Sequence, residues 1–141
     1  MSGSKSRKYL RRVRVLLDLV VMLLLLVLLG IWATRYLLAG QPLVMQIEHL
    51  LGSDKNMHLL LGFSLPLCVG WLMRLYRLRP LLQAGAFILT GFAYAGDEWF
   101  QSTLTFRTAS LDDFVMSITG LLLAVAVWYS LQSLIKTTGR E

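Results

Sequence analysis

The sequence predicts an all-α integral membrane protein in which a bundle of four transmembrane helices forms a single domain. The composition is too apolar for a soluble domain of this size, because 56% of the 141 residues are hydrophobic and the mean hydropathy is +0.62. Four apolar stretches are long enough to cross the hydrocarbon core as helices. The polar segments between them alternate in charge, as expected for a chain that crosses a membrane repeatedly.

The first span is predicted at about 15–38, behind a basic tail formed by residues 1–14. This tail carries six Lys and Arg side chains and no acidic residue. A basic run directly before an apolar stretch indicates a cytoplasmic flank facing anionic lipid, and we expect no nucleic-acid partner. Asp18 follows Arg14 by one helical turn, so the sequence predicts an i,i+4 ion pair between them.

The second and third spans are predicted at about 56–73 and 81–100. Pro66 lies inside the second span, where we expect it to kink the helix or loosen one turn. The third span carries three glycines, which are small enough to let neighbouring helices approach closely: Gly85, Gly91 and Gly96.

The fourth span is predicted at about 114–134, with Trp128 and Tyr129 near its far end as interfacial anchors. The loop after the first span has apolar residues at helical spacing over 44–51. This pattern indicates a short amphipathic helix in the outer interface, and an irregular or re-entrant loop stays open as the alternative. The single cysteine, Cys68, is expected to be a small buried hydrophobic residue.

The distribution of basic residues predicts the orientation of the bundle. The N-terminal tail and the segment between the second and third spans, which carries Arg74, Arg77 and Arg79, are basic without acids. The other two loops hold most of the acidic residues of the chain. The positive-inside rule therefore predicts a multi-pass protein with both termini in the cytoplasm.

Three polar clusters lie where the second span begins, the third ends and the fourth begins. In the predicted orientation all three share the outer face, and helical spacing places each on one stripe. Ionisable groups at such positions are costly, so a site that opens outward is the first hypothesis for them. Two acidic neighbours are expected to be bystanders of these clusters: Asp97 as a solvated carboxylate and Asp112 as an acid at a helix N-terminus. The clusters are Asp54, Lys55 and His58; Glu98 and Gln101; and Arg107, Asp113 and Ser117.

The order and spacing of these residues resemble the VanZ-like family of small bacterial membrane proteins. The resemblance covers about residues 15–134 and includes Gly120 after the third cluster. It implies a location in the bacterial cytoplasmic membrane and a connection with envelope lipids or glycans. The namesake of the family is linked to resistance to teicoplanin, a lipoglycopeptide. Ser117 departs from the family pattern, which usually has asparagine there; serine is shorter and weakens any ligand contact that the amide makes.

We interpret the site first as a binding site for an anionic or polar headgroup of a lipid, a lipid-linked cell-wall precursor or a lipoglycopeptide. Lys55 and Arg107 would engage phosphate, and the remaining cluster residues would bond sugar or amide groups. A second hypothesis is a hydrolase or transferase on a lipid-linked substrate, with His58, Asp54 and Glu98 as candidate catalytic residues.

A third hypothesis is a structural or partner-binding subunit, in which the clusters hold the bundle together, and a transporter is a weaker fourth. The sequence predicts no cofactor and no metal site. Only His49 and His58 are available as histidine ligands, and one histidine with two carboxylates is a generic set. Whether the chain forms an oligomer is left open.

Overall fold

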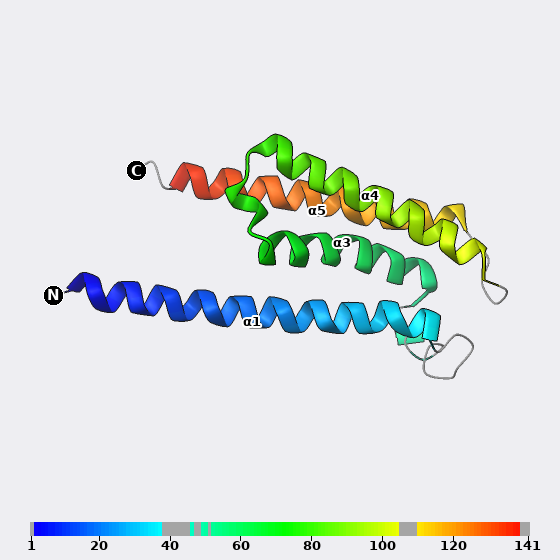
Figure 1. Cartoon of the computed structure of the whole chain (residues 1–141), viewed down its shortest axis with the longest axis horizontal. Helices are drawn as coiled ribbons and strands as arrows, with labels where there is room; N and C mark the ends of the chain where they lie inside the picture. The colour runs from blue at the N-terminus through cyan, green and yellow to red at the C-terminus, as the bar shows by residue number, and fades with distance from the viewer. Residues whose placement is uncertain (1, 38–45, 47–48, 51, 105–109, 139–141) are drawn as a thin grey trace.

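The computed structural model describes residues 2–37, 46, 49–50, 52–104 and 110–138. Within these residues the protein is all-α, as predicted, with four long helices and one short 3-10 turn (Figure 1). The elements are α1 (Ser2–Leu37), α3 (Asp54–Leu72), η1 (Leu75–Arg77), α4 (Pro80–Ser102) and α5 (Leu111–Thr138). The expected interfacial helix at 44–51 lies almost wholly outside the described residues.

The four helices coincide with the four predicted apolar stretches but extend beyond them. The largest difference is at the N-terminus, where α1 begins at Ser2 and includes the basic tail. Lys and Arg have high helix propensity, so the basic run continues the helix that the apolar residues form. Helix α3 continues through Pro66, and the side-chain oxygen of Ser53 caps its first turn by accepting a hydrogen bond from the backbone N–H of Asn56.

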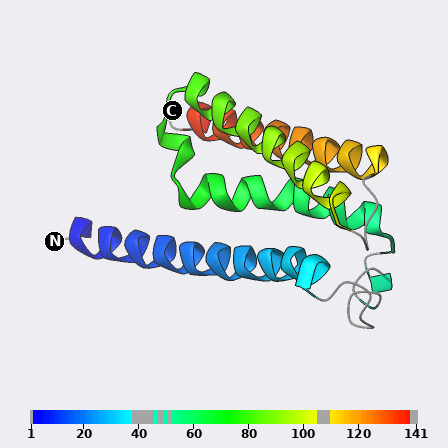
Figure 2. The same ribbon diagram turned by 45° about the vertical axis from the view of Figure 1, so that its right-hand side comes forward.

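Helix α3 lies between α1 on one side and the pair α4 and α5 on the other (Figures 1 and 2). The N-terminus of α1 and the C-terminus of α5 lie at the same end of the bundle (Figure 1). The start of α3, the end of α4 and the start of α5 lie at the opposite end, so the polar clusters that flank these helix ends are gathered there.

Two helices, α1 and α5, are long and apolar enough to cross a membrane. The qualifying segments are Arg11–Thr34 and Leu111–Leu134; within an apolar window of 18 residues in each, 6% and 28% of the residues are buried inside the protein. The outward faces of α1 carry Leu16, Leu19 and Leu23, each at least 60% exposed. Apolar surface of this extent is typical of contact with lipid or with another protein.

The closest helix contact joins α3 and α5 through two glycines, Gly62 and Gly120. A Cβ built on Gly62 would lie 2.4 Å from the backbone oxygen of Ser117, and one on Gly120 would lie 2.5 Å from that of Leu59. Each backbone therefore occupies the space that a side chain would need on the other helix. Of the three glycines predicted for this role on α4, Gly85 and Gly96 do not fill it, because added Cβ atoms there would meet nothing within 4 Å. A Cβ on Gly91 would make ordinary contacts with α5 side chains, with Leu121 at 3.5 Å and Ile118 at 3.8 Å.

The end of the bundle away from the polar clusters is held by a buried polar network centred on Gln83, which is 1% exposed. Its side-chain oxygen accepts hydrogen bonds from Trp128 Nε1 at 2.9 Å and Gln132 Nε2 at 2.8 Å, and its nitrogen donates to the Leu78 backbone oxygen at 2.9 Å. Trp128 is 7% exposed, so it is a core residue and the prediction that it anchors the interface is wrong.

Asp18 pairs with a different residue from the one that the sequence predicts. Its carboxylate accepts two hydrogen bonds from Arg74, at 2.9 and 2.5 Å, and one from Trp71 Nε1 at 2.9 Å. This contact ties the first helix to the end of α3. The Arg74 backbone is in the left-handed region, with φ of 59°, where the chain turns from α3 into η1.

We expect a double-mutant cycle on Asp18→Asn and Arg74→Gln to give a favourable coupling, because the guanidinium donates two hydrogen bonds to the carboxylate. In the matched cycle Arg14→Gln takes the place of Arg74→Gln, and the coupling should be clearly smaller, because only a coulombic interaction joins Arg14 to Asp18. The measurement is thermal unfolding followed with a thiol-reactive dye, because Cys68 is the single cysteine and is 4% exposed in the folded chain. Equal coupling in both cycles would indicate that Asp18 pairs with Arg14 as strongly as with Arg74.

Candidate functional site

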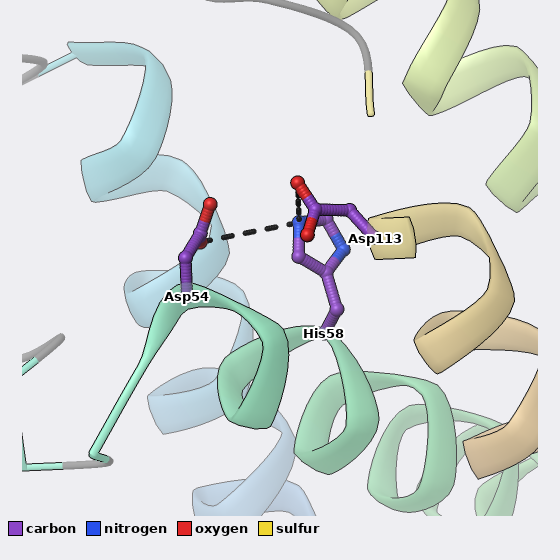
Figure 3. Close-up of side chains that lie close together, drawn as sticks. All are labelled: Asp54, His58 and Asp113. Atoms are coloured by element: carbon purple, nitrogen blue, oxygen red, sulfur yellow. Dashed lines mark ion pairs between the residues drawn. The ribbon is translucent and has the colours of Figure 1, made fainter. Parts of the chain in front are cut away.

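The polar end of α3 faces the polar start of α5, and His58 lies at the centre of this contact (Figure 3). His58 is 4% exposed and its Nδ1 is 3.1 Å from Ser117 Oγ. Its Nε2 is 3.8 Å from a carboxylate oxygen of Asp113 and 4.0 Å from one of Asp54. The dashed lines in Figure 3 join the same imidazole nitrogen to both carboxylates, that of Asp54 in the first turn of α3 and that of Asp113 in α5.

Local sequence explains why these side chains meet. Asp54 and His58 are one helical turn apart, as are Asp113 and Ser117, so each pair lies on one stripe of its helix. Gly62 and Gly120 continue the same stripes inward and let the two backbones touch. The close approach brings the four polar side chains together from positions more than fifty residues apart in the sequence.

A cavity of about 190 Å³ lies beside His58 and reaches all four helices. Its polar lining comes from His58, Tyr94, Asp97 and Ser117. The remaining wall is apolar and is formed by Trp32 of α1, Leu61, Gly62 and Leu65 of α3, and Ala93 of α4. None of the described residues that line the cavity is Lys or Arg.

Asp97 belongs to this cavity, although the sequence analysis treats it as a solvated bystander. Its carboxylate accepts hydrogen bonds from the Tyr36 hydroxyl, from Trp32 Nε1 at 3.2 Å and from Gln101 Nε2 at 2.8 Å. The carboxylate thus links α1 to α4 at the polar end of the bundle. The missed signal was Trp32 and Tyr36, two hydrogen-bond donors one turn apart near the end of the first span.

The predicted cluster on α4 divides between two places. Gln101 is 2% exposed and donates a hydrogen bond to Asp97, so it positions a carboxylate that lines the cavity without lining the cavity itself. Glu98 turns the other way: its carboxylate accepts a hydrogen bond of 2.5 Å from the Ser110 backbone N–H, beside a separate hollow lined by Trp99 and Phe114. Glu98 therefore positions the start of α5, and among the described contacts it is not brought to His58.

Lys55 lies on the exposed surface of the first turn of α3, with its side chain directed to Asp112. The two groups are 2.5 Å apart and both are exposed, at 53% and 68% of their side-chain surface. The hydrogen bond to Asp112 raises the pKa of Lys55 above its ordinary value, because the bond favours the charged ammonium. Asp112, expected to be a bystander, is thus the partner of the lysine that was predicted to hold phosphate.

Arg107, the other predicted phosphate ligand, lies outside the described residues. Of the eight predicted site residues, the structure gathers Asp54, His58, Asp113 and Ser117 into one cluster and places Gln101 behind the adjoining cavity. It directs Lys55 and Glu98 to other partners.

No family model, no curated protein and no solved structure matches this chain.

Proposed function

We propose that this chain is a VanZ-like bacterial membrane protein whose outward-facing site binds the polar headgroup of an envelope lipid, a lipid-linked cell-wall precursor or a lipoglycopeptide. In this proposal α1, α3, α4 and α5 all span the cytoplasmic membrane, with both termini inside. The order of the polar residues supports the family, and the alternation of basic and acidic segments supports the orientation.

The observation that carries the proposal is the cavity beside His58, which combines a polar lining with an apolar wall. Trp32 lies five residues before the end of α1, and Asp97 lies five before the end of α4. At about 1.5 Å per residue, these two lining residues lie about 7–8 Å below the helix ends. In the proposed topology this places the cavity near the boundary between headgroups and acyl chains. A lipid at this depth would present its polar and apolar parts to matching surfaces.

The size and charge of the cavity narrow the class of ligand. At about 190 Å³ it takes a headgroup or a sugar-sized fragment rather than a whole lipid, since pockets for drug-sized ligands are about 300–1,000 Å³. Its carboxylate and imidazole groups favour headgroups that donate hydrogen bonds, such as hydroxyls, amides and amines. Lys55 is engaged by Asp112, so the described side chains that line the cavity supply no cationic partner for a phosphate.

The test fills the cavity and measures the lipid that remains bound. Ala93 lines the cavity, and Ala126 is an exposed alanine on α5 away from it. We expect native mass spectrometry of the wild-type chain to show retained envelope lipid, Ala93→Phe to reduce this by about tenfold or more, and Ala126→Phe to leave it unchanged, since a lost headgroup site costs at least about 1.4 kcal/mol. Wild-type protein without retained lipid, or equal retention by both variants, would contradict the proposal.

A further inference from the structure

The cluster around His58 contains three side chains of the kinds that bind divalent metals, and they converge from two helices. One ligand atom from each of Asp54, His58 and Asp113 lies within 4.8 Å of the other two. The sequence alone predicts no metal site, because one histidine with two carboxylates is a generic set. The structure changes this, because the contact through Gly62 and Gly120 places the start of α5 against the first turns of α3.

We propose that Asp54, His58 and Asp113 form a binding site for one divalent transition-metal ion. An imidazole nitrogen with two carboxylate oxygens suits Zn²⁺ or Mn²⁺ better than Mg²⁺ or Ca²⁺, which favour oxygen-only ligand sets. The two carboxylates balance the charge of the ion. Two carboxylates held close to one buried imidazole nitrogen repel each other, and a cation bound between them offsets this repulsion.

The geometry is close to that of a bound ion. Ligand atoms at about 2.1 Å from a metal lie about 3.0–3.5 Å from one another. The separations of His58 Nε2 from Asp113 and Asp54 are 3.8 and 4.0 Å, and all three ligand atoms lie within 4.8 Å of one another. Binding would therefore draw the two carboxylates toward the ion by up to about 1 Å. Both aspartates lie in the first turns of their helices.

Ser117 supplies the outer support that metal-bound histidines normally have. A histidine that binds metal through Nε2 carries its proton on Nδ1, and this N–H needs an acceptor that fixes the ring. His58 Nδ1 is 3.1 Å from Ser117 Oγ, so the hydroxyl can accept this hydrogen bond and hold Nε2 toward both carboxylates. The serine that departs from the family pattern is suited to this positioning role.

Three protein ligands would leave a coordination position of the ion open, as in metal sites that bind water or substrate. The cavity lined by His58 and Ser117 adjoins the cluster, so a phosphate or carboxylate oxygen of a headgroup could reach that position. The ion would then supply the positive charge that the described cavity lining lacks. This last step rests on the proposed function, whereas binding of the ion does not.

The test uses the whole chain purified in detergent, stripped with a chelator and titrated with Zn²⁺ and with Mn²⁺ in the absence of added lipid. We expect one ion per wild-type chain. Asp113→Asn and His58→Gln should weaken or abolish binding, and Ser117→Ala should weaken it by about 10–100-fold. The chain offers two matched controls, Asp112→Asn and His49→Gln, which should bind the ion like the wild type.

Several results would overturn the site. Wild-type protein that binds neither ion, or an Asp112→Asn variant that loses as much affinity as Asp113→Asn, would do so. If the ligand variants unfold, as judged by the reactivity of Cys68, X-ray absorption of the Zn²⁺-loaded wild type decides: one imidazole with oxygen ligands supports the site, and any other ligand set rejects it. A further outcome is that the ion binds at the cluster but its removal by chelator leaves lipid retention unchanged. That result would reject only the link between the ion and the headgroup.

Discussion

Gly120→Leu is expected to abolish the folded bundle. A Cβ at this position would lie 2.5 Å from the Leu59 backbone oxygen and 2.7 Å from the Phe63 backbone nitrogen. Neither atom can move without displacing α3, so the two helices must separate. We expect the free energy of unfolding to fall by at least about 3 kcal/mol, the upper range for overpacked cores. The measurement is thermal unfolding followed by the reactivity of Cys68.

Gly96→Leu on α4 is the matched control for this substitution. A Cβ there would meet nothing within 4 Å, so we expect a change within about 0.5 kcal/mol. The comparison separates the cost of backbone contact from the general effect of replacing a helical glycine. Equal losses at the two glycines would contradict the close contact of α3 with α5, and with it the arrangement of the site around His58.

Gln83→Leu is expected to give the second largest loss of stability. The substitution removes the acceptor of Trp128 Nε1 and Gln132 Nε2 and the donor to the Leu78 oxygen. Each buried polar group left without a partner costs about 1–3 kcal/mol, so we expect a loss of about 2–5 kcal/mol. The same thiol-reactivity assay measures it, since Cys68 belongs to a different core cluster, which also contains Leu28, Met57 and Leu61.

Gln132→Leu provides the control, because it removes one hydrogen-bonding partner of Gln83 and leaves Trp128 bonded to it. A single hydrogen bond from a half-buried side chain contributes about 0.5–1.5 kcal/mol. We therefore expect the loss to be clearly smaller than at Gln83. Losses of similar size at both glutamines would indicate that Gln83 is not the centre of the network.

Neither Gly120→Leu nor Gln83→Leu replaces a residue of the proposed site, and the two substitutions act at different ends of the bundle. Gly120 continues the stripe that carries Asp113 and Ser117, so its replacement should also disperse the cluster around His58. Gln83 joins the start of α4 to the end of α5, away from the cluster. We expect Gln83→Leu protein that remains folded at low temperature to bind metal like the wild type.

Local sequence patterns specify the helices of this protein and the side chains at its polar end. Apolar stretches of about twenty residues with polar ends specify helices wherever they stand, because this signal is local. The i,i+4 spacing likewise places Asp54 with His58, and Asp113 with Ser117, on single stripes. These local patterns do not depend on which helix packs against which.

Which polar faces of the helices lie against one another depends on tertiary contacts. The tertiary structure joined Asp18 to Arg74 instead of Arg14, and Lys55 to Asp112. It also brought Asp97 into the cavity and directed Glu98 to the backbone at the start of α5. The physical reason is that helix rotation and spacing depend on contacts between distant residues. Here the contact through Gly62 and Gly120 fixes the register of α3 on α5 and so creates the cluster around His58.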